Sequence, residues 1–509
     1  MGDGTGTGPA CSGRIAGGHF APGGSASGGG ASSGSGSSPG EVGRLARLAA
    51  AVRDRQTSAV ELVERSLARI EAASALNAVV ALRAEAALAE AAAVDRATAR
   101  GEPVGPLGGL PLLVKDIEDV AGMRTTHGSL LHRDDPPARA DGLVPGRLRA
   151  AGAIVVGKTN VPEFAFEGYT DNRLFGPTRN PWGRDWSPGG SSGGSAAALA
   201  AGLAPIATSS DGGGSIRIPA SLCGLAGIKP TNGVVGRDPI PDWIDLSTDG
   251  PFATTVADLR LLLSLEAGPV AGDPTAQVGW RAGEPAMPSR ALAAPRIVDG
   301  GWPLPGPVGE LFDAALAAVE RDLALPVEPV EPGAVLRAGS ANDDWFTIAA
   351  VESLHRLGRD TVERHLGDLD PAFARWMGDA MRIGIDEYMA ARRRRYDYVR
   401  ELDVLLGDDT VLLTPTLAVD GWTLDGQPPD WPDWVGPGMP LDAFNTGAQN
   451  MTGHPAITVP AGVSPRGLPF GLQATAPRYR EDLLFGFALR WEAARPWPAA
   501  APGYQPFEV

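Results

Sequence analysis

Hydrophobic and polar positions along the first half of the chain follow the two periods of regular secondary structure. The run from Leu110 to Lys115 is almost wholly apolar and predicts a buried strand that ends at Lys115. Ser58 and Glu61 have the spacing of a capping box, which predicts a helix through Glu71. The same criteria predict strands at 77–82, 153–157 and 203–208 and helices at 83–100, 146–151 and 386–406. Strands that alternate with helices predict an α/β fold.

Two stretches depart from this pattern. Residues 23–38 consist of Gly, Ser and Ala, so we expect residues 1–40 to form a disordered tail and residues 41–500 to form the folded domain. Within that domain, residues 270–440 are Pro-rich and less regular, and we expect this variable region to shape the entrance to a binding site. In the alternative interpretation the tryptophans of this region only pack; those considered are Trp302, Trp345, Trp376, Trp422, Trp431 and Trp434.

Composition limits the classes of partner. The net charge is −16 and the pI is about 4.9, which argues against nucleic acid and an anionic membrane surface. No apolar run reaches the roughly 18 residues of a membrane span, and no ordinary signal peptide opens the chain, so we expect a cytoplasmic protein. We expect the run Arg392–Arg395 to be a solvated helix face. The sequence leaves open whether the chain forms a homodimer.

Lysine is rare, and its rarity indicates chemistry. Lys115, Lys158 and Lys229 are the only lysines among 44 Lys and Arg residues. Arg cannot lose its proton in a protein, whereas a buried Lys can. A lysine that persists in so Arg-rich a chain is therefore a candidate base, although it can also persist because Lys packs better at that position.

Two glycine-serine turns follow the predicted Lys115 strand. The first is Pro188-Gly-Gly-Ser-Ser-Gly-Gly-Ser195, and the second is Ser210-Asp-Gly-Gly-Gly-Ser215. Glycine lets backbone N–H groups approach a ligand closely, as an oxyanion hole requires. A flexible linker is the alternative interpretation of the first turn. Residues 23–38 show what such a linker looks like in this chain, because no strand, helix or second serine turn frames them.

The ordered set of Lys115, Gly189–Ser195 and Ser210–Thr231 resembles the signature of the amidase signature family. The resemblance extends to segments such as Ala151–Asn160, Phe175–Trp182 and Asn450–Pro460, and covers about residues 41–495. It implies an α/β fold with a mixed central β-sheet covered by helices on both faces. It also implies hydrolysis of a small-molecule carboxylic acid amide to an acid and ammonia or an amine, through a serine acyl-enzyme and without a cofactor.

The resemblance assigns roles residue by residue. It implies a triad of Lys115 as the base, Ser191 as a bridging serine held by a cis peptide bond, and Ser215 as the nucleophile. The oxyanion hole is implied to consist of the backbone N–H groups of Gly212, Gly213, Gly214 and Ser215. Ser192, Asp211 and Arg217 are implied to support the nucleophile loop.

Four positions depart from the usual family pattern and bear on substrate preference. Ile117 and Glu118 follow Lys115-Asp116 where Asn and Ile are common, and Gly212 replaces a frequent Thr. In the segment that carries Phe166 and Glu167, relatives often have a small residue in place of Glu167. Aromatic rings near the acyl pocket favour an apolar or aromatic substrate group. A desolvated Glu167 would instead select a cationic or hydrogen-bond-donating group.

Other chemistries fit the sequence less well. The amidotransferase A subunit that serves tRNA-bound glutamate is an alternative within the family, and a silent binding scaffold is an alternative outside it. Neither serine turn contains a histidine; His127 follows the Lys115 strand and could line the site, whereas we expect His454 to pack in a turn. Cys11 and Cys223 cannot form a thiolate metal site, and no metal is expected.

Overall fold

The computed structural model describes residues 42–297, 304, 306–337, 340–426 and 445–509. The expectation of a disordered tail over residues 1–40 therefore lies outside the described residues, and so do Cys11, Trp302, Trp431 and Trp434.

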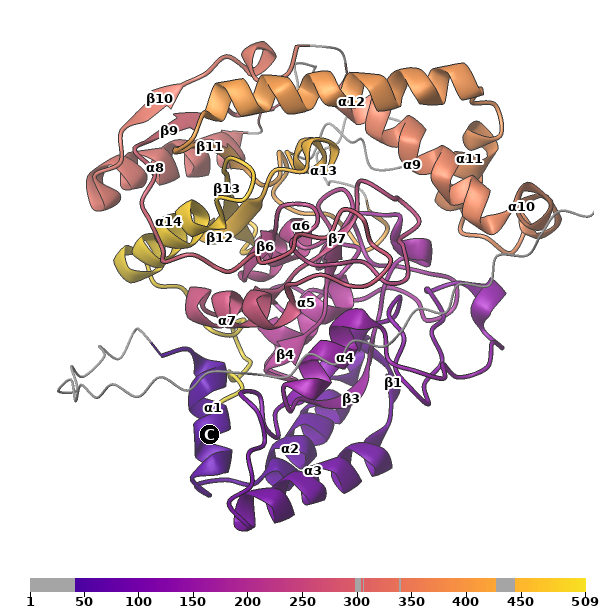
Figure 1. Cartoon of the computed structure of the whole chain (residues 1–509), viewed down its shortest axis with the longest axis vertical. Coiled ribbons are helices and arrows are strands. Elements are labelled where there is room, and N and C mark those ends of the chain that lie inside the picture. The colour runs from indigo at the N-terminus through magenta and orange to yellow at the C-terminus, as the bar shows by residue number, and fades with distance from the viewer. Residues whose placement is uncertain (1–41, 298–303, 305, 338–339, 427–444) are drawn as a thin grey trace, which may run out of the picture. The chain divides into compact units, whose positions relative to one another are not determined.

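A four-stranded sheet forms in the first half of the chain, in the order β1-β3-β2-β4. Strands β1, β3 and β4 are labelled in Figure 1. Strands β3 and β4 run parallel to β2, and β1 runs antiparallel to β3. Helices α2, α3 and α5 pack against this sheet. The strands are β1 (Val79–Leu82), β2 (Pro111–Lys115), β3 (Ile154–Thr159) and β4 (Ile206–Ala207). The helices of this half are α1 (Arg44–Arg53), α2 (Ala59–Ala72), α3 (Ala84–Ala99), α4 (Leu143–Ala150) and α5 (Gly193–Ala200), with short 3-10 turns η1 (Ser74–Leu76), η2 (Leu130–His132) and η3 (Glu163–Ala165).

A seven-stranded mixed sheet follows, in the order β10-β9-β11-β13-β12-β6-β8, with parallel pairs β10/β9 and β9/β11. Its strands are β6 (Ala226–Lys229), β8 (Phe252–Ala253), β9 (Arg290–Ala293), β10 (Val327–Pro329), β11 (Thr410–Pro415), β12 (Ala456–Val463) and β13 (Pro469–Thr475). Strands β5 (Ser210–Asp211) and β7 (Thr248–Asp249) form a separate antiparallel pair.

The remaining helices cover the seven-stranded sheet or gather beside it. Helices α6, α7, α8 and α14 contact its strands, whereas α9 contacts α10, α11, α12 and α13 (Figure 1). The helices are α6 (Arg217–Cys223), α7 (Val256–Glu266), α8 (Gly306–Leu323), α9 (Ala341–Leu357), α10 (Arg359–His365), α11 (Pro371–Ala380), α12 (Ile385–Leu406), α13 (Gly447–Thr452) and α14 (Glu481–Ala494), with the 3-10 turn η4 (Pro332–Ala334). The predicted α/β class with a mixed sheet is confirmed.

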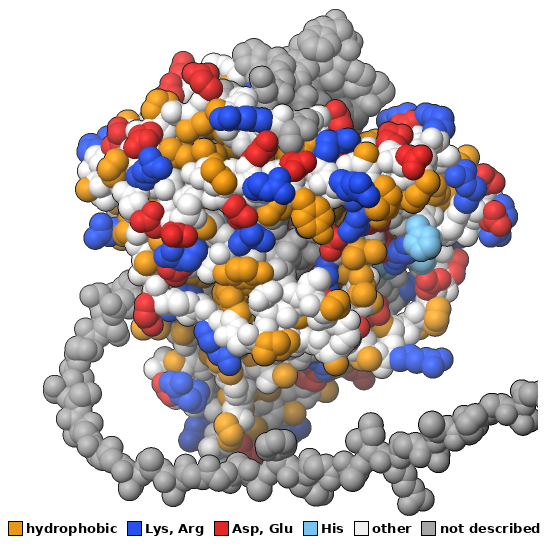
Figure 2. All heavy atoms as spheres, turned by 45° about the horizontal axis from the view of Figure 1, so that its top comes forward, with side chains coloured by type: hydrophobic (Ala, Val, Ile, Leu, Met, Phe, Trp, Pro, Cys, Tyr) orange, Lys and Arg blue, Asp and Glu red, His pale blue; other side chains and the backbone are white. Residues whose placement is uncertain are grey.

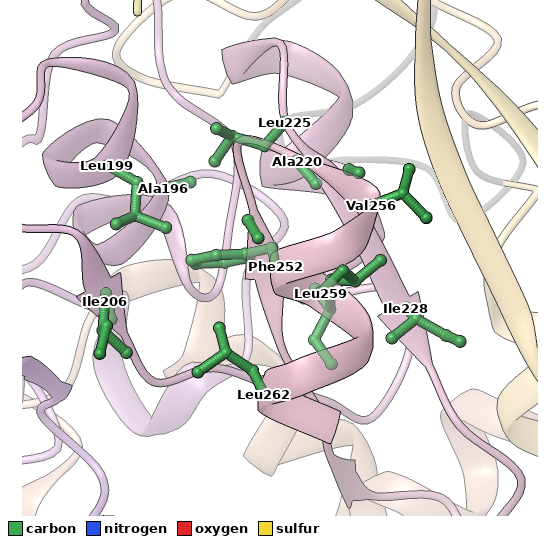
Figure 3. Packing of buried hydrophobic residues seen from close by; sticks show 14 of the residues in the cluster. Ala196, Leu199, Ile206, Ala220, Leu225, Ile228, Phe252, Val256, Leu259 and Leu262 are labelled. Carbon is green, nitrogen blue, oxygen red and sulfur yellow. The ribbon is translucent and has the colours of Figure 1, made fainter. Parts of the chain in front are cut away.

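A hydrophobic core holds in place the two helices that follow the serine turns. Leu199 of α5 and Ala220 of α6 lie in one cluster with Phe252 of β8 and Leu259 of α7 (Figure 3). Phe252 and Leu259 are fully buried, and burial of such side chains contributes about 1.5–3 kcal/mol each. Because α5 begins directly after Ser192 and α6 begins two residues after Ser215, this core positions both turns.

Most predicted elements of the first half are present with shifted ends. The capping box is confirmed, since Ser58 Oγ accepts from the Glu61 N–H and Glu61 accepts from the Ser58 N–H. The strand expected at 203–208 is shorter, because only Ile206–Ala207 pairs with β2.

The expectation of an irregular region over 270–440 is wrong for much of the described chain there. Helices α8 to α12 occupy it. Two of them carry local start signals: Ser340 caps α9 through the Asp343 N–H, and Asp370 caps α11 with Pro371 at its first turn.

The arginine run on α12 is also not a simple solvated face. Arg392 pairs with Asp245 and Glu352, Arg394 donates to Asp344, and Arg395 donates to the Met451 carbonyl. These arginines therefore tie α12 to other segments. On the face drawn in Figure 2, acidic and basic side chains are intermixed. Over the described ranges, no helix is both long and apolar enough to cross a membrane.

Candidate active site

Lys115 is fully buried at the end of β2 and contacts two serine hydroxyls. Its Nζ lies 2.8 Å from Ser191 Oγ and 2.9 Å from Ser210 Oγ. The other two lysines are as buried but have other partners: Lys158 pairs with Asp116 at 2.9 Å, and Lys229 donates to the Pro230 carbonyl. Of the three candidate bases, Lys115 is the one that the structure places against serines.

The two serine turns meet in space. The Gly190–Ser191 peptide bond is cis, as the resemblance implied. The Ser192 N–H donates to the Ser215 carbonyl at 3.4 Å, which links the first turn to the second. Ser191 and Ser215 are buried and line the same cavity. The structure therefore brings together the three residues predicted as a triad.

A buried ion pair braces the Ser215 loop. Arg217 donates to both carboxylate oxygens of Asp211, at 3.0 and 2.9 Å, and both side chains are fully buried. Asp211 in turn accepts from the Gly214 and Ile216 N–H groups. Although burial alone would raise it, the pKa of Asp211 is lowered by Arg217 and Asn450. The predicted supporting role of Asp211 and Arg217 agrees with this geometry.

One predicted oxyanion donor needs correction. The Gly214 N–H donates to Asp211 Oδ1 at 2.7 Å, so it is not available to a substrate. By contrast, no described residue accepts a hydrogen bond from the N–H groups of Gly212, Gly213 and Ser215. Trp345 Nε1 donates to the Gly212 carbonyl at 2.7 Å, and because that peptide is trans and planar, the Gly213 N–H points to the opposite side. The candidate oxyanion donors are therefore Gly212, Gly213 and Ser215.

Carboxylates surround the buried Lys115. Burial lowers the pKa of Lys115 to about 8, although Glu118, Asp249 and Asp211 oppose the shift. Asp116, which follows Lys115 in the chain, forms an ion pair with Lys158 instead. A turn brings Glu118 back toward the strand end, since its N–H donates to the Lys115 carbonyl at 3.0 Å. Asp249 lies on β7 directly across from Ser210. Burial raises the pKa of Glu118, and repulsion by the carboxylate of Asp249 raises it further.

Two cavities adjoin Ser215. The larger has a volume of about 360 Å³ and is lined by Ser191, Ser210 and Ser215 together with Glu118, Asp249 and His127. The smaller has a volume of about 40 Å³, and its walls include Phe166, Glu167, Gly213, Trp243 and Trp345. His127 therefore lines the site, as the sequence suggested, and burial lowers its pKa to about 3, so the ring is neutral. Glu167 lies on the wall of the small cavity, where burial raises its pKa to about 7.

Several residues complete the site although the sequence assigns them no specific contact there. Ser210 opens the second turn, and its position two residues before the glycines was the one local signal for its contact with Lys115. Trp345 and Thr446 hold the carbonyls of Gly212 and Gly213 from more than 100 residues away, and no local pattern marks them.

A metal-dependent or cysteine-based site finds no support in the described parts of the chain. No group of three or more His, Cys, Asp or Glu side chains there could hold a metal ion. Cys223 is buried, and burial raises the pKa of its thiol, which makes it a poor nucleophile. His454 is buried as well, 3.1 Å from Asp403.

The comparison with known families agrees with the geometry. The Amidase family model matches residues 61–485. The chain belongs to the amidase signature family. An acylamidase from Rhodococcus erythropolis is 35% identical over 468 residues, which cover 89% of this amidase-family chain and 96% of the relative. The A subunit of the glutamyl-tRNA(Gln) amidotransferase from Ralstonia nicotianae is 34% identical over 495 residues, covering 90% and 99%.

Solved structures of the same family have the same fold. A bacterial aryl acylamidase of the amidase signature family has a TM-score of 0.81 at 29% identity, covering 90% of this chain and 98% of that one. A 6-aminohexanoate cyclic dimer hydrolase has a TM-score of 0.79 at 28% identity, covering 92% and 99%. The amidase signature fold predicted from the sequence is thus confirmed.

Proposed function

We propose that the chain is an amidase that hydrolyses a small-molecule carboxylic acid amide through an acyl-enzyme on Ser215. The observation that carries this proposal is the contact of 2.8 Å between Lys115 Nζ and Ser191 Oγ, at a cavity that Ser215 also lines. A buried lysine next to a serine hydroxyl has the geometry of an activated nucleophile and its base. The family membership supports the same reaction class.

Acylation starts from the neutral form of Lys115. Ser215 Oγ attacks the amide carbonyl carbon while its proton passes to Ser191 Oγ, whose own proton passes to Lys115 Nζ. The carbonyl oxygen becomes an oxyanion that the N–H groups of Gly212, Gly213 and Ser215 can stabilise. The C–N bond then breaks, and the proton held by Lys115 returns through Ser191 to the leaving nitrogen.

Deacylation uses the same groups in reverse roles. Water attacks the acyl carbon of the Ser215 ester and loses a proton through Ser191 to Lys115. The ester C–O bond breaks, Ser215 Oγ is reprotonated, and the carboxylic acid leaves. The chemistry of both steps is complete with the protein's own side chains and water.

The walls of the small cavity support a substrate that carries an apolar group. Phe166, Trp243 and Trp345 provide flat apolar surface beside Ser215. Glu167 lies on the same wall, and the raised pKa of its carboxyl, about 7, leaves much of it protonated near neutral pH. In that form it can donate a hydrogen bond to a substrate, which weakens the case for a cation in the small cavity.

The direct test uses the purified chain alone with a panel of aryl and alkyl amides, followed by detection of the released amine. Turnover of at least one amide is the expected result. The relatives named as amidotransferase A subunits, at 34–36% identity, favour a second candidate function. A protein of that kind would hydrolyse glutamine with partner subunits and would leave the amide panel intact when tested alone.

The pH dependence of turnover gives a second expectation. Since burial lowers the pKa of Lys115 to about 8, kcat/KM should rise nearly tenfold per pH unit below about pH 8 and level off above it, as the neutral base accumulates. Profiles over pH 6–10, with folding checked by circular dichroism, provide the measurement. A rate that declines steadily above pH 7 in folded protein contradicts a lysine base.

A further inference from the structure

The two cavities beside Ser215 differ about ninefold in volume. A cavity needs about 10–15 Å³ to hold one water, so the small cavity of about 40 Å³ has room for a group of roughly three non-hydrogen atoms. The large cavity of about 360 Å³ has room for a group many times that size. Ser215 and Trp243 line both cavities, so the reacting carbonyl must sit where the two meet.

The position of Ser191 decides which half of the substrate enters which cavity. Ser191 lines the large cavity and is not among the residues that line the small one. In the mechanism above, the leaving nitrogen takes its proton from Ser191 Oγ, so the amine half must lie on the Ser191 side. The candidate oxyanion donors divide in the same way, because Gly212 faces the large cavity and Gly213 faces the small one. The acyl substituent is then left with the small cavity.

We propose that the enzyme is selective for amides of short acyl groups with large amines, the acyl chain in the small aromatic cavity and the amine in the large one. This inference rests on the proposed function and names its substrate class. Acetyl and propanoyl amides fit the small cavity, whereas hexanoyl and benzoyl amides exceed it.

The walls of the small cavity are held in place and cannot easily yield to a longer chain. Phe166 stacks on Trp376 with ring centroids 4.0 Å apart. Trp345 is anchored through its Nε1 to the Gly212 carbonyl, and Trp243 donates its Nε1 hydrogen to Ser353 Oγ at 2.7 Å. Forcing extra methylenes into such a packed site costs binding energy.

The wall of the large cavity sets the charge that the amine half can carry. Both of its arginines are already paired, Arg356 with Asp242 at 2.5 Å and Arg237 with Asp273 at 3.3 Å. Among the described lining residues, Asp119, Asp238, Glu118 and Asp249 add further carboxyl groups to this wall, and none adds a cation. A neutral or cationic amine therefore suits the cavity, and an amine that carries a carboxylate does not.

The first experiment measures kcat/KM for anilides with acetyl, propanoyl, butanoyl, hexanoyl and benzoyl groups. The wild type should prefer acetyl or propanoyl over hexanoyl by about 10-fold or more. Phe166→Ala should raise the hexanoyl-to-acetyl ratio by about 10-fold, because it removes one wall. Phe346→Ala is the matched control: Phe346 also packs on Trp376 but does not line the cavity, so the ratio should stay within about twofold.

A second series keeps the acetyl group and varies the amine among aniline, naphthylamine, an aminomethyl-aniline and an aminobenzoate. We expect naphthylamine to be accepted within a few-fold of aniline, and the aminobenzoate to be at least about 10-fold worse than the cationic analogue. A preference for hexanoyl or benzoyl amides, or equal ratios in both phenylalanine variants, overturns the assignment. A better rate for the anionic amine overturns the charge argument.

The outcome remains informative if no amide is turned over. In that case the proposed function fails, and calorimetric binding of acetanilide and hexanoylanilide to Ser215→Ala still tests the cavities. Tighter binding of acetanilide supports the orientation, whereas tighter binding of hexanoylanilide refutes it.

Discussion

Lys115→Arg is expected to lower kcat/KM nearly as much as Lys115→Ala, by about 10²- to 10⁴-fold. Arginine keeps the positive charge but cannot release its proton, so it cannot accept one from Ser191. Lys115 Nζ contacts both Ser191 and Ser210, and the burial that lowers its pKa to about 8 prepares it for this role. Steady-state rates of both variants on one amide, with circular dichroism to verify folding, provide the measurement.

Lys158→Arg is the matched control, because Lys158 is as buried as Lys115 but serves through its charge in an ion pair with Asp116. We expect folded Lys158→Arg to lose less activity than Lys115→Arg. Retention of more than about a tenth of the wild-type rate by Lys115→Arg would be incompatible with a base worth 10²-fold or more.

The local parts of the site could be predicted from the sequence because neighbouring residues build them. The apolar run before Lys115 forms the strand that buries it, and the glycines before Ser215 form the loop that presents backbone N–H groups. The assignment of Gly214 failed for a reason that a motif cannot show. The carboxylate of Asp211, three residues earlier, is oriented by Arg217. It accepts the hydrogen bond of the Gly214 N–H, which is therefore not free to bind a substrate.

The electrostatic environment of Lys115 depends on pairing that the sequence does not display. Asp116 is adjacent in the chain, but it lies in the turn directly after β2 and pairs with Lys158 of the neighbouring strand β3. Asp249 acts on Lys115 because β7 pairs with β5, a contact between residues about 40 apart. These electrostatic contacts join residues of different structural elements, so they can be identified only once the fold is known.

The aromatic wall of the small cavity could be predicted only in part, because it too combines residues that lie far apart in the sequence. Phe166 and Glu167 lie near the signature in sequence and could be proposed as pocket residues. Trp345 belongs to the region whose Pro-rich sequence predicts irregular structure, and its contact with Gly212 arises because α9 packs beside the Ser215 loop. Trp345 thus packs and also shapes the site, so the two interpretations of the tryptophans are not exclusive.

Ser215, and not Ser191, is expected to carry the acyl group. The candidate oxyanion donors belong to the loop that ends in Ser215, whereas Ser191 Oγ is hydrogen-bonded to Lys115 and is proposed to relay protons. Ser215→Ala should therefore lower the rate by about 10⁴-fold or more, and Ser191→Ala by about 10²- to 10⁴-fold. Ser210→Ala is the matched control: it removes a contact to Lys115 outside the relay and should cost less than either.

Covalent labelling distinguishes the two serines directly. A fluorophosphonate reacts with the activated nucleophile, and peptide mass spectrometry locates the adduct. We expect modification of Ser215 in the wild type, weaker labelling of the same residue in Ser191→Ala, and none in Ser215→Ala. Ser191 should stay unmodified in all three proteins. Its hydroxyl is hydrogen-bonded to Lys115, and the proposed mechanism places no oxyanion donor in the turn that carries Ser191. An adduct on Ser191 with Ser215 intact would exchange the two roles and move the acyl group into the large cavity's side of the site.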